Sequence, residues 1–421
     1  MTPTMQLVLA LMIIIIVAKV GGYVSLRLGQ PSVLGQLLVG LLLGPSLLDF
    51  LHWSIFTDGH LGETIHELAE LGVLLLMFIA GLSLHLSDLV ESRRVAALAG
   101  TLGVVAPVLM GLVLGRLLGF DNEASLFIGL ILSATSVSIS AQTLMELDAL
   151  RSRVGISLLG AAVFDDILVV LGLSVFVALV VGGAGAGGLA GVAEIALRMA
   201  LFLIVSLVAG LVLLPTRLSR LIHHLPISEG LIAFVFVTVL LYSWAAEVLG
   251  SMADITGAFL AGLIFARSPL KDHIETGISA LAHGLFVPIF FVNIGLIANI
   301  RELSADGVVL LVAMTIVAIV SKVGGAGLGG RLGGLTNRES LQLGVGMMSR
   351  GEVGLIVATV GVSNRVIGAD AFAAVVGVVI LTTLLTPPIL RSLLSAPLPS
   401  AQPVYDEAGE EKEEVAAGET S

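Results

Sequence analysis

Long apolar stretches, separated by short polar turns, run through most of the chain. A helix needs roughly 17 to 25 apolar residues to cross a hydrocarbon core about 30 Å thick. By this criterion the sequence predicts about 13 membrane spans, at residues 5–28, 32–48, 64–83, 95–118, 124–145, 155–181, 191–215, 229–249, 254–268, 278–298, 307–330, 340–361 and 370–394. The expected fold is therefore all-α and polytopic, with one transmembrane domain over residues 1–394.

The composition fits a membrane protein and excludes a soluble enzyme, since 57% of the residues are hydrophobic and only 12% are charged. Cysteine is absent, which excludes disulfides and thiolate chemistry. Residues 395–421 change to a Pro-rich and then acidic composition, which predicts a disordered tail. Much of the net charge of -11 lies in this tail, so it says little about a ligand.

Lysine and arginine collect in one set of alternate loops, for example at Arg93, Arg94, Arg151 and Arg153, whereas Arg116 lies on the opposite side. Short cytoplasmic loops accumulate such residues. With an odd number of spans, we expect the N-terminus outside and the acidic tail in the cytoplasm, in a plasma (inner) membrane.

Two adjacent acids, Asp165 and Asp166, interrupt the apolar sixth span. Ionisable groups at this depth are costly and indicate a functional site. Without cysteine or histidine beside them, the two carboxylates favour protons or hard monovalent cations over a transition metal. Lys322, midway along the eleventh span, must pair with an acid or lose its proton, and these two are the nearest acids by depth.

Polar residues also interrupt the fifth and twelfth spans. Six hydroxyl residues crowd the fifth span, among them Thr135 and Ser136, and they can stabilise a broken helix. In the twelfth span Arg350 and Glu352 flank Gly351, where their charges would compensate the ends of two half-helices. The alternatives are an intact fifth helix with back-bonded hydroxyls and a purely structural ion pair in the twelfth.

These interruptions predict inverted six-helix repeats, because six spans, a linker span and six more place the fifth and twelfth in corresponding positions. Secondary transporters of this architecture bind ions where two broken helices cross near the bilayer midplane. Glu70 and Asn293 are secondary candidates, although polar side chains often only link membrane helices. No nucleotide-binding loop is found, so ATP-driven transport is not expected.

Several motifs together resemble the monovalent cation/proton antiporter superfamily, in the branch of NapA-type sodium/proton antiporters and Kef-type potassium efflux systems. These motifs are LAELGVLLLMFIAGL at 68–82, SATSVSIS at 133–140, AAVFDDILVVLGL at 161–173, GAFLAGLIFA at 257–266, FVPIFFVNIGL at 286–296 and SRGEVGLIVA at 349–358, with Lys322 between the last two. Their order and spacing are specific, and the resemblance covers nearly the whole chain.

The resemblance implies a homodimer in which each protomer has a dimerisation domain and a mobile core that moves like an elevator. It makes Asp166 the main cation ligand and proton carrier. Asp165 would pair with Lys322 when no cation is bound, and Thr135 and Ser136 would assist coordination. The acid pair with the lysine resembles the electrogenic subgroup, which exchanges two protons for one sodium. No cofactor and no nucleic-acid partner is implied.

Two departures from the family pattern concern regulation or gating: Ser83 stands where relatives often have glutamate, and Asp254 where an apolar or small residue is usual. Kef-type systems append a large nucleotide-binding domain, so Na+ or Li+ antiport is favoured over K+/H+ antiport or K+ efflux. An organic-anion symporter would expose more positive charge, a channel would need a continuous polar path, and an intramembrane hydrolase would need a substrate gate.

Overall fold

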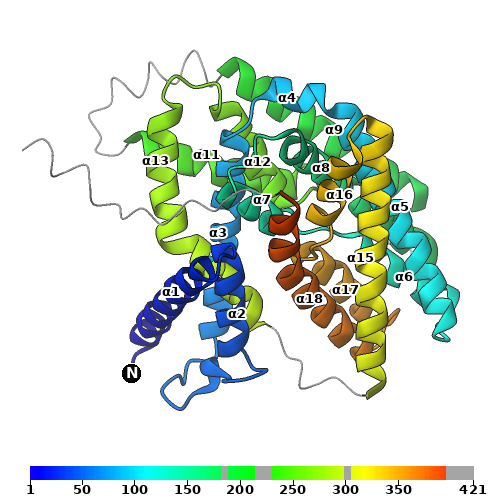
Figure 1. The fold of residues 1–421 in the computed structure, drawn as a ribbon, viewed down its shortest axis with the longest axis horizontal. Coiled ribbons are helices and arrows are strands. Elements are labelled where there is room, and N and C mark those ends of the chain that lie inside the picture. Colours follow the sequence, from blue (N-terminus) through cyan, green and yellow to red (C-terminus); the bar gives the residue numbers. More distant parts are fainter. Residues whose placement is uncertain (182–187, 214–229, 298–304, 395–421) are drawn as a thin grey trace, which may run out of the picture.

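The computed structural model describes residues 1–181, 188–213, 230–297 and 305–394. Within these ranges the chain is helical and no strand occurs. The described residues contain ten helical segments long and apolar enough to cross a membrane, and these pack into one bundle (Figure 1). The predicted all-α, polytopic membrane fold is confirmed, whereas the predicted tail at 395–421 lies outside the described residues.

The helices follow the predicted spans. The spans at 124–145 and 340–361 are interrupted between two helices, whereas the span at 278–298 continues through a π-helical segment, Ala282–Phe286. Their bounds are α1 (Pro3–Arg27), α2 (Ser32–Leu43), α3 (Leu61–Leu82), α4 (Leu86–Glu91), α5 (Arg93–Leu117), α6 (Asn122–Ser133), α7 (Val137–Glu146), α8 (Arg153–Phe176), α9 (Gly188–Leu213), α11 (Gly230–Val248), α12 (Asp254–Phe265), α13 (Lys271–Leu281), α14 (Val287–Leu296), α15 (Ala305–Gly333), α16 (Asn337–Gly346), α17 (Glu352–Ser363) and α18 (Ala369–Leu394). The number of 13 spans and the inverted repeats remain predictions.

Side-chain caps set the start of several helices. The Asp121 carboxylate accepts a hydrogen bond from the Ala124 N–H at 2.7 Å at the start of α6. The Ser152 hydroxyl oxygen accepts one from the Gly155 N–H at 3.1 Å at the start of α8. Such caps satisfy backbone N–H groups that have no partner within the helix. They define the starts of α6, which ends just before Thr135, and of α8, which carries Asp165 and Asp166.

The described helices pack in two groups. The first helix group contains α1 to α3 and α11 to α14, and the second contains α5 to α8 and α15 to α18. α9 contacts α8 of the second group as well as α11 and α12 of the first. The two groups meet where α7 and α18 pack against α2 and α3.

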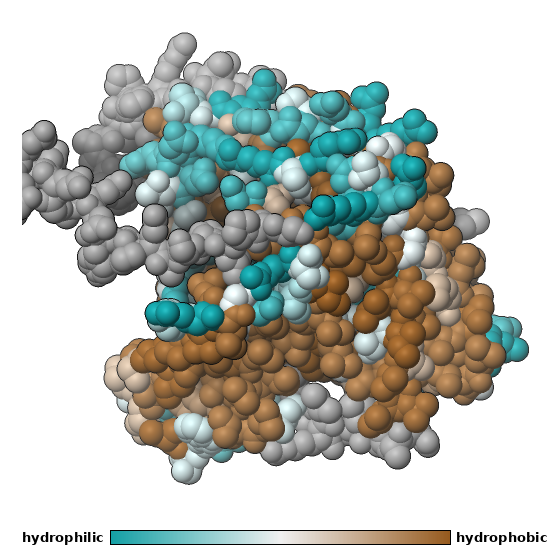
Figure 2. Space-filling view, in the orientation of Figure 1, coloured by the Kyte–Doolittle hydropathy of each residue, from teal (hydrophilic) through white to brown (hydrophobic). Residues whose placement is uncertain are grey.

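The surface and the interior are both typical of a membrane protein. Figure 2 shows a broad hydrophobic band, with hydrophilic residues gathered along one edge over α4. Apolar side chains such as Val8, Met12 and Ile16 on α1 are about half exposed, whereas the charged side chains of Asp165 and Lys322 are buried. The candidate chemistry therefore lies inside the bundle.

Candidate ion-binding site

The fifth predicted span is interrupted at residues 134–136, between α6 and α7. Ala134 and Ser136 have extended backbones, so polar backbone groups near them lose their helical partners. Thr135 is buried, and its Oγ1 has no hydrogen-bond partner within the described residues. By contrast, the Ser133 hydroxyl donates to the Leu130 carbonyl at 2.6 Å. Thr135 thus offers an unpartnered oxygen at the break.

The twelfth predicted span is interrupted between α16 and α17. Arg350 lies in this break and is buried. Its guanidinium donates to the Met348 carbonyl at 3.1 Å, just beyond α16, and to the Ala318 carbonyl of α15 at 3.0 Å. The positive charge therefore compensates the negative end of α16. Glu352 starts α17, and only its backbone is described.

Two threonines of α18 hold the second break in place. The Arg350 backbone N–H donates to Thr382 Oγ1 at 3.1 Å, and the Thr383 hydroxyl donates to the Arg350 carbonyl at 2.9 Å. Both threonines are buried. The sequence reasoning missed them, although hydroxyls at 382, 383 and 386 within an apolar span were an available signal.

The two breaks bind each other directly. The Ser136 N–H donates to the Ser349 carbonyl at 2.9 Å, and the Ser349 hydroxyl donates to the Ser136 carbonyl at 2.7 Å. The Ser140 hydroxyl also donates to the Gly346 carbonyl. Gly351 packs so closely that a Cβ there would lie 2.5 Å from Ser136 Cβ. These contacts fix the crossing and occupy the Ser136 backbone.

Lys322 of α15 and Asp165 of α8 form an ion pair at 0% exposure, with Nζ 2.5 Å from Oδ1. Helix α5 approaches this pair through Gly103, where a Cβ would lie 3.5 Å from Lys322 Nζ. The second carboxylate oxygen of Asp165, Oδ2, has no hydrogen-bond partner in the described part of the chain. The pair therefore cancels two charges and leaves one oxygen unpartnered.

Asp166 lines a small cavity at the boundary between the two helix groups. Val137, the first residue of α7, lines the same cavity, as do Ile255 and Thr256 of α12. Asp166 is 6% exposed. Its position places the carboxylate beside the first break and opposite the first helix group. Among the described residues, no three His, Asp or Glu side chains form a metal-binding cluster.

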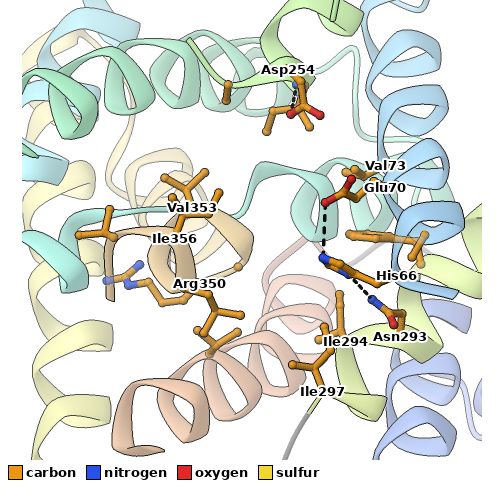
Figure 3. A pocket seen from close by; sticks show the side chains of 18 of the residues that line it. His66, Glu70, Val73, Asp254, Asn293, Ile294, Ile297, Arg350, Val353 and Ile356 are labelled. Carbon is orange, nitrogen blue, oxygen red and sulfur yellow. Dashed lines mark hydrogen bonds and ion pairs between the residues drawn. The ribbon is translucent and has the colours of Figure 1, made fainter. Parts of the chain in front are cut away.

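A larger cavity of about 390 Å³ opens between the two helix groups. Figure 3 shows its facing walls, with Arg350, Val353 and Ile356 on one and His66, Glu70 and Asn293 on the other. Asp254, at the start of α12, also lines it. Its lining lies towards the helix ends that are remote from the arginine-rich loops. Ile255 lines both this cavity and the small one at Asp166.

The secondary candidates Glu70 and Asn293 line the larger cavity rather than the small one at Asp166. His66 joins them, with its Nδ1 at 3.1 Å from Asn293 Nδ2 and its Nε2 at 3.4 Å from Glu70 Oε1. All three residues belong to the first helix group. His66 was not singled out from the sequence, because one histidine in a span carries no pattern.

Comparisons with known proteins show which sequences and folds this chain resembles. The family described as "Sodium/hydrogen exchanger, transmembrane" matches residues 12–396. The chain is 36% identical over 392 residues to the Na+/H+-K+ antiporter GerN of Bacillus cereus, covering 91% of this chain and 95% of GerN. It is 33% identical over 390 residues to a Na+/H+ antiporter of Enterococcus hirae, covering 92% of this chain and 98% of that protein.

The fold also resembles a solved structure. The sodium proton antiporter MjNhaP1 of Methanocaldococcus jannaschii at pH 8 matches with a TM-score of 0.66 at 17% identity, over 93% of this chain and 99% of MjNhaP1. The family expected from the motifs is confirmed, and the named relatives are transporters rather than enzymes. This chain belongs to the sodium/hydrogen exchanger family.

Proposed function

We propose that this protein is a secondary-active antiporter that exchanges Na+ or Li+ for protons across the plasma (inner) membrane. The observation that carries the proposal is the buried Lys322–Asp165 pair, with Asp166 next to it in the sequence and beside the first of two crossing helix breaks. A structural or sensor protein would not need both acids and the lysine inside the bundle.

We assign the cation to Asp166, with Asp165 Oδ2 and Thr135 Oγ1 as further ligands. The latter two atoms are buried and have no hydrogen-bond partner in the described residues. Carboxylate and hydroxyl oxygens suit a hard cation. Ser136 has its backbone N–H and carbonyl bonded to Ser349, so its main contribution is to hold the crossing.

Transport follows from competition at Asp166. An ionised carboxylate takes up a dehydrated cation, and a proton displaces that cation when the site faces the other side of the membrane. Either ligand neutralises the charge of Asp166, and a compensated carboxylate crosses hydrocarbon at lower cost than a bare one. A proton gradient would thereby drive net cation export.

The Lys322–Asp165 pair supports a stoichiometry of two protons per cation. When a cation binds between both carboxylates, Lys322 loses its partner and releases its proton. When the cation leaves, Lys322 takes up a proton and closes the pair again, while Asp166 takes up the other proton. Exchange would then be electrogenic.

Alternation between the two sides would occur by elevator-like movement of the second helix group against the first. The second group contains Asp165, Asp166, Lys322 and both breaks, whereas the first provides α12, which faces Asp166. The larger cavity between the groups is the route by which ions reach the site in this conformation. By resemblance to the family, the first group would also form a homodimer.

Potassium is the second candidate ion, because the relative GerN is named for both Na+ and K+. An organic anion is disfavoured, since both side chains proposed as charged ligands are acidic. These ions can be separated by one transport assay.

The test measures cation-induced proton movement in proteoliposomes with a preset pH gradient, adding Na+, Li+ or K+ to the protein and to Asp166→Asn. We expect Na+ or Li+ to drive exchange, and the asparagine variant to lose it, because an amide does not carry a proton in exchange for a cation. Lower pH should raise the apparent KM for the cation in the parent protein.

Glu123→Gln is the matched control, since Glu123 is an exposed acid in the first turn of α6, at the far end of the fifth predicted span from the break. It should retain full exchange. Unchanged exchange in Asp166→Asn would overturn the assignment of the ion to this residue. If K+ alone drives exchange, then K+ rather than Na+ is the transported cation.

A further inference from the structure

One partly buried carboxylate in the second helix group is not used by the proposed transport cycle. Glu146, the last residue of α7, reaches across to the start of α2 in the first helix group. Its Oε2 accepts the Ser32 backbone N–H at 2.5 Å, and its Oε1 accepts the Ser32 hydroxyl at 2.6 Å. The Gln142 amide, one turn earlier on α7, donates to Oε1 at 2.9 Å.

The hydrogen bonds between Glu146 and Ser32 are expected to be strong, because they join a carboxylate to the start of a helix. A carboxylate at the N-terminus of a helix satisfies free N–H groups and is stabilised by the positive end of the helix dipole. Hydrogen bonds to an ionised group are stronger than those between neutral groups. Breaking them leaves a partly buried carboxylate without these donors.

Two arginines of the second group lie against the first group at the same end of the bundle. The Arg151 guanidinium, just after α7, donates to the Ser83 carbonyl at the end of α3 at 2.9 Å. Arg391 of α18 lies against Gly29, where a Cβ would be 3.2 Å from its Nη2. The larger cavity lies towards the opposite helix ends. The groups are thus tied at one end and open at the other.

We propose that the Glu146–Ser32 contact is a catch that holds the protein in the conformation with the larger cavity open. The proposal rests on the proposed function, in which the second helix group moves relative to the first. A shift of α7 along α2 by a few ångströms would separate these atoms. The catch must therefore open before Asp166 can face the other side.

A catch differs from an ordinary helix cap in that it joins the two helix groups, whereas an ordinary cap joins residues of one group. Glu339 accepts a hydrogen bond from the Thr336 N–H at the start of α16, and both residues lie in the second group. Glu339 and Thr336 would move together with the second helix group, so the proposed movement would not break their hydrogen bond. The Glu146 contact joins α7 to α2, which belong to different groups.

The test uses single cysteines, because the chain has none of its own. Ile356→Cys reports the larger cavity, since Ile356 is 60% exposed and lines it, and Val33→Cys reports the catch, since Val33 is 0% exposed next to Ser32. Purified protein is labelled with a water-soluble maleimide. With Glu146→Gln, we expect about tenfold slower labelling at 356 and about tenfold faster labelling at 33, as loss of a bond to a charged group predicts.

Ser32→Pro provides a second variant that keeps the helix. Ser32 is the first residue of α2, a position that proline favours, and the change removes both the N–H and the hydroxyl. Like Glu146→Gln, it should slow labelling at position 356 and speed labelling at position 33. Glu123→Gln, at the far end of the same span, should leave both rates unchanged.

Unchanged labelling in both catch variants, with melting temperatures equal to the parent, would overturn the catch. That outcome would leave the proposed function standing if Asp166→Asn still abolishes exchange. Conversely, if exchange survives in Asp166→Asn, the proposed function is contradicted, whatever the labelling rates show.

Discussion

At the scale of single residues, Asp165, Lys322 and Arg350 are charged side chains with almost no exposure. Burying an unpaired charge costs several kcal/mol, so each needs a compensating group. Asp165 and Lys322 compensate each other, whereas Arg350 is held by backbone carbonyls. The difference matters, because a carbonyl cannot give up or take a proton, while the acid and lysine can. We therefore propose that Lys322 of this pair exchanges a proton, as Asp166 does, and that the arginine has a structural role.

Replacement of Lys322 by methionine is expected to leave Asp165 as an unpaired buried charge. Removal of one member of a buried pair costs roughly 3 to 5 kcal/mol. The melting temperature of the purified protein should fall accordingly. The double variant Asp165→Asn with Lys322→Met should recover most of this stability, because no charge remains, but it should not exchange two protons per cation. A single variant as stable as the parent would show that the pair does not form.

Thr135→Val tests the unpartnered hydroxyl at the first break. Valine has nearly the same shape, so the fold should be retained while one oxygen ligand is lost. Interactions with charged groups are worth roughly 1.5 to 3 kcal/mol, so we expect the apparent KM for the cation to rise about tenfold or more, with little change in melting temperature. Ser133→Ala is the control, because the Ser133 hydroxyl is already bonded to Leu130. Equal KM values for the parent and Thr135→Val would show that the Thr135 hydroxyl is not a ligand of the cation.

At the scale of helices, the breaks in α6–α7 and α16–α17 depend on each other. Free backbone groups inside a membrane must find partners, and here each break supplies them to the other through Ser136 and Ser349. Helix α18 supplies the rest through Thr382 and Thr383. The crossing is therefore a single hydrogen-bonded unit, and a change at one break should disturb the other.

Gly351→Ala should disrupt this crossing, because its Cβ would lie 2.5 Å from Ser136 Cβ. Overpacking of this kind costs typically about 1 to 3 kcal/mol, and we expect exchange to fall at least tenfold. Gly354→Ala, three residues later in α17, is the matched control, since its Cβ would meet atoms no nearer than 3.9 Å. Parallel transport assays on the two variants make the comparison. Similar losses in both would point to helix flexibility rather than to the crossing.

The start of α16 depends on a capping box between Thr336 and Glu339. Thr336→Ala should lower the free energy of unfolding by about 1 kcal/mol, as loss of such a cap does elsewhere.

The Thr336 N–H, together with Arg153 at 3.7 Å, lowers the pKa of Glu339 below its ordinary value. The contribution of Glu339 is therefore fully present above its unfolded-state pKa and is lost as the pH falls through the lowered folded-state value. Thermal unfolding of Glu339→Gln at several pH values should converge with the parent in acid.

At the scale of the whole molecule, hydropathy was enough to predict the helical spans and the ionisable residues inside them. A charge such as Lys322 or Asp166 stands out in an apolar run because lipid tolerates so few. The hydroxyls of the fifth span and Gly351 likewise indicated breaks, and helix ends lie beside both.

Contacts between distant segments could not be predicted in this way. The bonds from Thr382 and Thr383 to Arg350 and from Glu146 to Ser32 join residues whose spacing follows no helical period. The division into two helix groups also depends on which apolar faces pack together, and nearly uniform apolar faces do not specify their partners. The sequence therefore indicated which residues carry charge, but not how the two groups divide them.

The neutral Lys322–Asp165 pair also determines whether the membrane voltage contributes to transport. If the lysine keeps its proton throughout, the site has the same charge with Na+ as with H+, and the voltage does no work on the exchange. If cation binding expels that proton, one elementary charge crosses in each cycle, which is worth about 2.3 kcal/mol per 100 mV. The sodium ratio that a cell can maintain would then depend on the square of its proton ratio multiplied by a voltage factor. With a negative interior this factor favours proton entry, so export could continue in alkaline surroundings where the outside holds fewer protons than the cytoplasm.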